Sequence, residues 1–196
     1  MAQYFDNVEL KSELRKFDVS LLGYSFSFYS DNGVFSKDKL DFGTRLLLES
    51  IDWKEVSGPI LDVGCGIGPI GIIASKLTGF EVTMCDVNKR ALHLCERNVR
   101  QNNAECRIIE SNCYEKIAGS FNTIITNPPI RAGKAIVYGI FEGALSHLNE
   151  NGCLFVVIRK QQGAESAISK IKDLFGNCDI IDKNKGYFIL KATKNV

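Results

Sequence analysis

The sequence predicts an α/β protein whose central sheet is mostly parallel and covered by helices on both faces. After residue 57, short apolar runs alternate with longer stretches of helical periodicity, a pattern that builds parallel strands joined by crossover helices. The apolar runs are residues 60–63, 80–85, 106–109, 121–126 and 154–158. The expected helices are residues 70–77, 89–102, 135–148 and 163–175.

The end of the chain should form an antiparallel hairpin. Two further apolar runs, residues 178–181 and 187–190, are separated only by residues 182–186. A parallel connection needs a dozen or more residues, usually in a helix, so this gap is too short for one. We therefore expect the parallel sheet to finish with an antiparallel pair.

The segment before residue 57 has a different pattern. Residues 24–28 alternate large apolar with small polar side chains, which is typical of a strand with one buried face. Residues 17–21 can pair with them through a turn at Leu22 and Gly23. A helix is expected around Leu46–Leu48. We therefore expect residues 1–56 to form a hairpin-and-helix extension packed on the same domain as residues 57–196.

Composition excludes several classes of protein. The chain has 196 residues, with 24 basic and 23 acidic side chains and a net charge of +1, so it is most simply one domain without a polybasic tail. Its apolar runs fall far short of the roughly 18 residues of a membrane span, and the first residues lack the pattern of a secretory signal. Seven cysteines, none spaced as CxxC, argue against a disulfide framework and a thiolate metal site. We expect a cytoplasmic protein without a metal.

A glycine-rich turn follows the first strand of the predicted parallel sheet. Gly64, Gly66 and Gly68 form GxGxG, and Pro69 stands where the dinucleotide fingerprint GxGxxG has its third glycine. Such a loop lets a nucleotide-like ligand approach the start of the next helix, although a tight turn without a ligand has the same appearance. Asp62, two residues ahead, could accept from backbone amides or meet a cationic ligand. The loop thus speaks against an NAD-linked oxidoreductase.

An acidic residue follows the second of these strands. Asp86 stands where nucleotide-binding folds place a carboxylate that accepts the hydroxyls of a ribose. A cap for the helix that follows is the alternative role, and the two roles are compatible.

Asn127, Pro128 and Pro129 form the most specific segment of the chain. Proline cannot donate to a strand ladder, so the strand must stop here, at the edge where open α/β sheets bind ligands. The Asn127 side-chain oxygen and the Pro128 carbonyl are two acceptors, which suits an –NH₂ group. A plain strand-ending turn is the alternative.

Together, LDVGCGIGPIG, CDV and TNPPI resemble class I S-adenosylmethionine-dependent methyltransferases, which have a Rossmann-like seven-stranded sheet with one antiparallel strand. The upstream GVFSKDKLDFGTRLLL, residues 33–48, is similar to the family of small-subunit ribosomal RNA guanine-N2 methyltransferases. The resemblance extends from about Tyr4 to Lys191, and a single copy of the domain places the chain with the short members.

The resemblance implies S-adenosylmethionine as cofactor and assigns a role to each matching residue. The cofactor residues would be Asp62, Gly64, Cys65, Gly66 and Gly68 at the methionine part, Asp86 at the ribose, and Val87, Asn112 and Cys113 near the adenine. The catalytic residues would be Asn127, Pro128, Pro129 and Ile130. Ile130 stands where the family often has Tyr or Phe to stack on the target base, and Phe35 is the substitute candidate.

The resemblance implies methyl transfer to an exocyclic amine, with guanine N2 in ribosomal RNA as the expected target. Electrostatic stabilisation by two acceptors needs no strong base, so His93 and His147 are expected to be surface or packing residues. The basic side chains near the predicted site are Lys37, Lys39, Arg131, Lys134, Arg159 and Lys160. Arg131 and Lys134 directly follow the proline pair and are expected to contact RNA phosphates, with Phe35 and Lys37 also on the substrate.

Three alternatives remain at this point. A methyltransferase acting on DNA adenine or on protein glutamine would share the Asn-Pro-Pro segment. A non-catalytic RNA-binding module could retain the fold. The sequence leaves the oligomeric state open.

Overall fold

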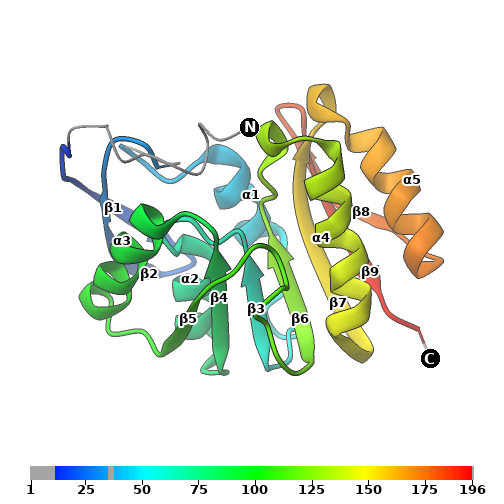
Figure 1. Ribbon diagram of the computed structural model, residues 1–196, viewed down its shortest axis with the longest axis horizontal. Coiled ribbons are helices and arrows are strands. Elements are labelled where there is room, and N and C mark those ends of the chain that lie inside the picture. The colour runs from blue at the N-terminus through cyan, green and yellow to red at the C-terminus, as the bar shows by residue number, and fades with distance from the viewer. Residues whose placement is uncertain (1–11, 35–37, 196) are drawn as a thin grey trace.

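The computed structural model describes residues 12–34 and 38–195, and its centre is a seven-stranded sheet (Figure 1). The strand order is β5-β4-β3-β6-β7-β9-β8, and within this described part six strands run in one direction and β9 runs in the opposite one. The strands are β3 (Ile60–Val63), β4 (Val82–Asp86), β5 (Cys106–Glu110), β6 (Phe121–Thr126), β7 (Leu148–Arg159), β8 (Asp179–Asn184) and β9 (Tyr187–Thr193). The predicted α/β class and its final hairpin are confirmed.

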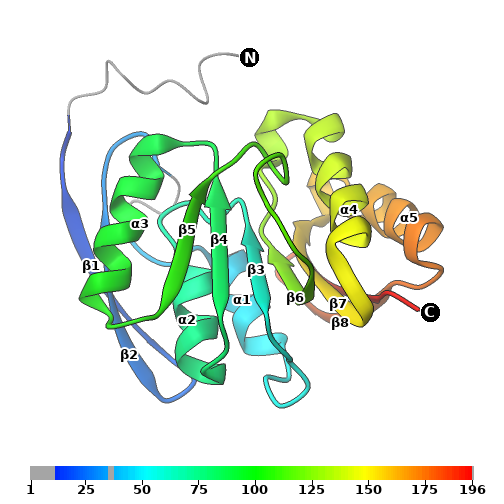
Figure 2. The ribbon, with the colours of Figure 1, turned by 60° about the horizontal axis from the view of Figure 1, so that its bottom comes forward.

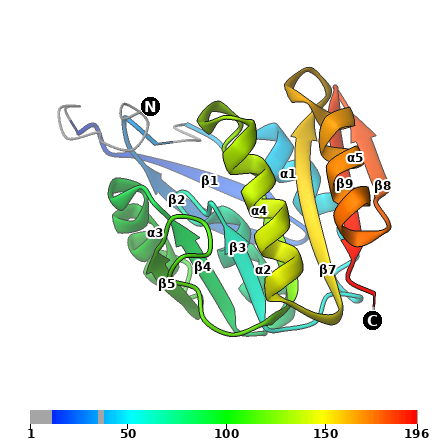
Figure 3. The same cartoon turned by 45° about the vertical axis from the view of Figure 1, so that its right-hand side comes forward.

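Helices cover both faces of this sheet. They are α1 (Phe42–Ser50), α2 (Pro69–Thr78), α3 (Lys89–Gln101), α4 (Lys134–His147) and α5 (Ala164–Phe175), with short 3₁₀ turns η2 (Ile130–Ala132) and η3 (Lys160–Gln162). Ile60 and Ile125 pack toward α1, α2 and α3, whereas their neighbours Leu61 and Ile124 pack toward α4 and α5. Successive strand residues point to opposite faces, so each central strand must be apolar throughout. Figure 3 shows α4 and α5 side by side over their face.

The N-terminal hairpin consists of β1 (Arg15–Leu21) and β2 (Tyr24–Ser30), paired as predicted through the turn at Leu22 and Gly23. It lies beside α3 (Figure 2). The fully buried Asn98 of α3 accepts from the Tyr29 amide at 2.6 Å and donates to the Tyr29 carbonyl at 3.0 Å. The same Asn98 amide nitrogen donates to the Ile67 carbonyl at 2.9 Å. One buried amide therefore ties the hairpin to the glycine loop.

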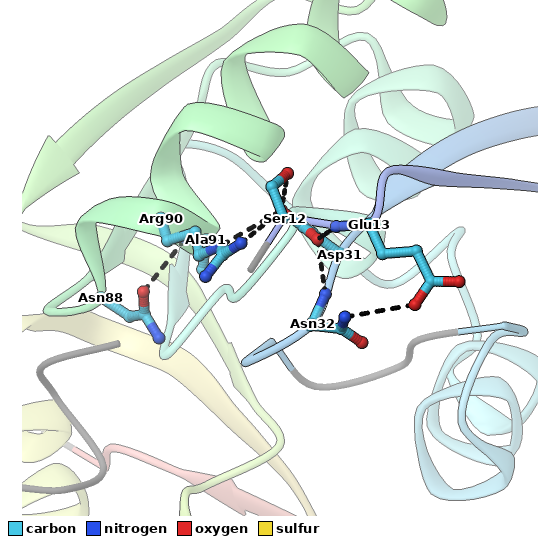
Figure 4. A network of polar contacts seen from close by, with 7 residues as sticks. All are labelled: Ser12, Glu13, Asp31, Asn32, Asn88, Arg90 and Ala91. Atoms are coloured by element: carbon cyan, nitrogen blue, oxygen red, sulfur yellow. Dashed lines mark hydrogen bonds and ion pairs between the residues drawn. The ribbon is translucent and has the colours of Figure 1, made fainter. Parts of the chain in front are cut away.

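A second polar contact joins the hairpin to the start of α3 (Figure 4). Asp31, which follows β2 and is 5% exposed, accepts from the Arg90 guanidinium at 2.8 and 3.1 Å. It also accepts from the Ser12 hydroxyl at 2.8 Å and the Glu13 amide at 2.5 Å. Burial opposes ionisation, but these hydrogen bonds outweigh it and lower the pKa of Asp31 to about 2. The network anchors the chain just before the segment that precedes α1.

The structure differs from the sequence expectation at several element ends. β8 continues to Asn184, so the final turn is Lys185 and Gly186 rather than residues 182–186. β7 begins at Leu148 rather than 154, because its polar start is held by neighbours: the Asn151 amide donates to the Lys194 carbonyl at 2.8 Å. β4 begins at Val82, which leaves Phe80 41% exposed before it. The division of the chain at residue 57 remains a prediction.

Among residues 12–34 and 38–195, no helix combines the length and the apolar character needed to cross a membrane.

Candidate functional site

The predicted site residues gather where β3, β4 and β6 end. Gly64 and Cys65 follow β3, and their amides both donate to the Cys85 carbonyl of β4 at 2.9 Å. On the other side, the Thr126 hydroxyl at the end of β6 donates to the Val63 carbonyl at 2.7 Å. These bonds fix three strand ends next to one another at the edge where open α/β sheets hold ligands.

The glycine loop has one open side. Gly64 and Gly66 have φ values of +74° and +54°, a region that disfavours other residues. A Cβ on Gly66 would meet nothing within 4 Å, and one on Gly64 would meet only Cδ of Pro129, at 3.8 Å. The loop is therefore open on the side that faces the Asn-Pro-Pro segment, where a ligand can come close to the protein backbone.

Gly68 has a different reason to be glycine. Its φ is +92°, and a Cβ there would lie 2.6 Å from the Cys95 sulfur of α3. Close packing of α3 against the start of α2 thus accounts for this glycine without a ligand. Cys65 is also turned inward, because its side chain is 4% exposed, so only its backbone borders the loop.

Asp62 is a buried carboxyl with one oxygen unused. Its Oδ2 accepts from the Gly71 amide at 3.0 Å and so caps α2, whose N-cap residue Gly68 has no side chain to do this. No described residue bonds to its Oδ1, which is buried. Burial, with a smaller contribution from Asp86, raises the pKa of Asp62 to about 8. An unpaired buried oxygen of this kind fits a ligand that is cationic or donates a hydrogen bond.

Asp86 ends β4 with both carboxylate oxygens held by the backbone. Oδ2 accepts from the Gly66 amide at 2.8 Å and Oδ1 from the Asn88 amide at 2.9 Å. Burial still raises its pKa. The cap of α3 is Asn88, whose side chain accepts from Ala91, so Asp86 is not the helix cap. The carboxylate is fixed in place and keeps lone pairs for a ligand.

The loop after β5 lies beside the end of β4. The Ser111 amide donates to the Asp86 carbonyl at 3.0 Å, and the Cys85 thiol donates to the Cys113 carbonyl at 3.5 Å. Asn112 is exposed there and donates to Glu115 at 2.7 Å. Val87, next to Asp86, is half-buried. The structure thus brings the residues assigned to adenine close to Asp86.

The Asn127 side chain is oriented by the first turn of α1. Its Nδ2 donates to the Thr44 hydroxyl at 2.9 Å and to Oδ2 of Asp41 at 3.4 Å. No described residue donates to the Asn127 Oδ1 or to the Pro128 carbonyl. Two unused acceptors therefore remain beside the glycine loop. Sequence reasoning assigned no role to Asp41 and Thr44; Asp41 is a favoured N-cap residue, but that signal marks only the start of α1.

The remaining candidates are dispersed. Ile130 is half-buried against the core of α4 and α5. Arg131 in η2 and Lys134 at the start of α4 are exposed, and Lys134 Nζ lies 5.0 Å from the centre of the Tyr138 ring. Of the other basic candidates, Lys39, Arg159 and Lys160 are also exposed. Phe35 and Lys37 lie outside the described residues.

The histidines occupy helices, as predicted. His93 is exposed on α3, and His147 stacks on Tyr114 at the end of α4. In the described part of the chain, no group of three or more His, Cys, Asp or Glu side chains is arranged to hold a metal ion.

The known proteins similar to this chain are of two kinds, some about as long as the chain and others about twice as long. The family model of the methyltransferase small domain matches residues 25–191. The Bacillus subtilis (strain 168) uncharacterized protein YbxB is 45% identical over 195 residues, covering 97% of both chains. The ribosomal RNA small subunit methyltransferase C of Vibrio vulnificus is 32% identical over 188 residues, which are 92% of this chain and 53% of that protein.

A solved structure agrees with the sequence matches. It is the T. Thermophilus 16S rRNA N2 G1207 methyltransferase in complex with AdoMet and guanosine, with a TM-score of 0.85 at 25% identity. The match covers 95% of this chain and 52% of that one. The chain thus spans nearly all of the B. subtilis protein but about half of the small-subunit methyltransferases.

Proposed function

Since this chain belongs to the methyltransferase small domain family, we propose that it transfers a methyl group from S-adenosylmethionine to an exocyclic amine, specifically guanine N2 in ribosomal RNA. The observation that carries the proposal is the orientation of Asn127. Its amide nitrogen is occupied by α1, so its oxygen is left to accept from an amine beside the glycine loop.

The residues around the glycine loop fit the proposed cofactor. Asp62 offers an unpaired buried oxygen, Gly66 leaves open space, and Asp86 presents a fixed carboxylate for ribose hydroxyls. When bound, S-adenosylmethionine supplies a methyl group that its sulfonium already makes electrophilic. The protein therefore needs only to bind, align and stabilise charge.

The Asn-Pro-Pro segment supplies that alignment. A base amine is a poor nucleophile because its lone pair is delocalised into the ring. Acceptance of its two hydrogens by Asn127 Oδ1 and the Pro128 carbonyl would favour a pyramidal nitrogen and oppose the positive charge that develops on it. The proline after Asn127 restricts its backbone to extended conformations, which keeps both acceptors at the strand end.

Support for a guanine in ribosomal RNA comes from the relatives. The names of two relatives refer to ribosomal RNA of the small subunit, and the solved structure contains guanosine. Exposed Arg131 and Lys134, directly after the Asn-Pro-Pro segment, suit phosphates that flank an extruded base. RNA is accordingly the proposed partner.

A methyl-transfer assay with radiolabelled cofactor tests the proposal. The substrates are ribosomal subunits, naked ribosomal RNA, DNA and total protein, and the control is Asn127→Ala, whose turnover should fall by about 10²- to 10³-fold. Label in ribosomal RNA, found as N2-methylguanosine on digestion, is the expected result. If label appears only in DNA or only in protein, the substrate is adenine or glutamine and not a guanine of ribosomal RNA. Cofactor binding to wild-type protein without transfer to any of the four would favour a non-catalytic module.

A further inference from the structure

We propose that Asp41 and Thr44 are positioning residues that determine which atom of Asn127 faces the target amine. The consequence for catalysis rests on the proposed function, but the orientation itself is a property of the protein alone. Both residues contact the amide nitrogen of Asn127, so neither is placed to touch the reacting amine itself. Each acts on Asn127 across a large separation in the sequence.

An asparagine amide has two ends of nearly equal size and opposite hydrogen-bonding character. The carboxylate of Asp41 only accepts hydrogen bonds when ionised, so it selects the Nδ2 end of Asn127. A flipped Asn127 would set its oxygen against that carboxylate and turn an –NH₂ group toward the substrate. Two –NH₂ groups facing each other have no acceptor between them, so the flipped form cannot hold an amine.

The first turn of α1 is built to hold both partners at once. Oδ2 of Asp41 accepts from the Thr44 amide at 3.0 Å as the helix N-cap, and the same oxygen receives Asn127. Thr44 is 3% exposed, and its hydroxyl receives the shorter bond of 2.9 Å. The helix cap and the orientation of Asn127 therefore depend on one carboxylate.

Helix α1 is itself anchored to β8 and β9, the last two strands of the sheet. At its start, Gly43 approaches β9 so closely that a Cβ would lie 2.7 Å from the Tyr187 ring. At its end, the Ser50 hydroxyl donates to Asp182 of β8 at 2.8 Å. A rigid element held at both ends can fix a side chain far better than a loop can. The strands beyond β7, remote from the glycine loop, thus set the position of Asn127.

Three variants separate positioning from folding. Thr44→Val removes the hydroxyl but keeps the shape, and Thr44→Ser restores it. Asp41→Ser retains a good N-cap with a shorter side chain that does not reach Asn127. Glu49→Ala removes an exposed ion pair with Arg45 on the same helix and is the matched control.

The first measurement is NMR of the ligand-free protein, which needs no activity. Asn127→Ala identifies the Asn127 –NH₂ signals by their loss. We expect Thr44→Val and Asp41→Ser to move these signals toward free-amide positions, whereas Thr44→Ser and Glu49→Ala leave them near those of the wild type. Unchanged Asn127 signals in both Thr44→Val and Asp41→Ser would overturn the proposal.

The second measurement is kinetic. Misplacement of a reacting partner costs up to about 10²-fold, so Thr44→Val should lower kcat by about 10- to 100-fold without changing cofactor affinity. Thr44→Ser should restore the rate. In the Asn127→Ala background, Thr44→Val should cost nothing further, because its effect passes through Asn127. An equal loss in both backgrounds would contradict the positioning role.

The two measurements also separate this inference from the proposed function. If wild-type protein transfers methyl to no nucleic acid or protein, the proposed function fails, and the NMR result alone decides whether Asp41 and Thr44 orient Asn127. If transfer occurs and the NMR signals respond but the rate does not, the orientation has no catalytic consequence and the positioning role fails.

Discussion

A Cβ atom on Gly64 would lie 3.8 Å from Cδ of Pro129, so the glycine loop faces the Asn-Pro-Pro segment across a gap that one methyl group would fill. One segment is proposed to bind the methyl donor and the other the amine. Their closeness would place donor and acceptor side by side, which is the alignment that a direct transfer needs.

Gly64→Ala should therefore weaken the cofactor site in two ways. The φ of +74° strains any side chain by about 1–2 kcal/mol, and the new methyl group projects between the loop and Pro129. We expect cofactor affinity, measured by calorimetry, to fall by about tenfold or more, as 1.4 kcal/mol corresponds to a factor of ten.

Gly119→Ala is the matched control for this substitution. Its φ is +88° and nothing lies within 4 Å of a Cβ there, so it carries similar strain in a loop before β6. It should lower the melting temperature comparably but leave cofactor affinity unchanged. Equal cofactor affinity in Gly64→Ala and wild type would show that the loop wall does not contact the ligand.

Asp86→Ala should reduce cofactor affinity more than any loop glycine variant. It removes the acceptor of the Gly66 amide and the proposed charge-assisted bonds to ribose, each worth about 1.5–3 kcal/mol. Asp86→Asn keeps one acceptor and should be intermediate. Asp173→Ala, which removes an exposed carboxylate on α5, is the control. Calorimetry that finds wild-type affinity in Asp86→Ala would remove this residue from the cofactor site.

Much of the sheet could be predicted because its strands carry clear local signals. The bounds of β3 and β6 match the predicted runs, since a glycine loop ends one and a proline pair ends the other. The polar start of β7 carries no such signal, because its strand character comes from pairing partners elsewhere in the chain. Asp86 and Asn127 were predictable for the same reason as the strands: each stands at a strand end.

Contacts between distant segments were not predictable. The bond from Asn127 to Thr44 depends on where α1 docks, and the sequence near either residue does not contain that information. The same holds for Gly68, whose glycine follows from the approach of Cys95 on another helix. Local patterns thus indicated the candidate site, whereas the contacts of Asn127 with the first turn of α1 emerged only from the packed fold.

The Asp31 network predicts a specific dependence of stability on pH. The pKa of Asp31 is about 2 in the folded protein, below the roughly 3.9 of an unfolded chain. Its contribution is therefore fully present above about pH 4 and is lost as the pH falls through about 2. With allowance for solvent screening, we expect a contribution of about 1–2 kcal/mol, which Asp31→Asn should remove at pH 7.

Thermal unfolding at several pH values checks this prediction. A loss of 1 kcal/mol lowers the melting temperature of a chain of this size by about 2–4 °C. Asp38→Asn, which breaks the exposed pair with Arg15 at 2.5 Å, should change the melting temperature little. If Asp31→Asn and wild type differ equally at pH 7 and pH 2, the ionised form of Asp31 is not what stabilises the hairpin.

The last prediction concerns how the protein would hold RNA. Arg131 and Lys134 are exposed directly after the Asn-Pro-Pro segment, so replacing both with Ala should weaken binding to RNA of any sequence. Each lost phosphate contact should reduce the slope of log affinity against log salt by about 0.7–0.9. Cofactor affinity should not change, because neither residue lies on the glycine loop.

The control is Lys54→Ala with Lys76→Ala, which removes the same charge from the loop before β3 and the end of α2. Those positions lie at the opposite edge of the sheet, so this control should keep the wild-type salt slope. An equal reduction in both double variants would mean that net charge, and not a local contact, governs RNA binding.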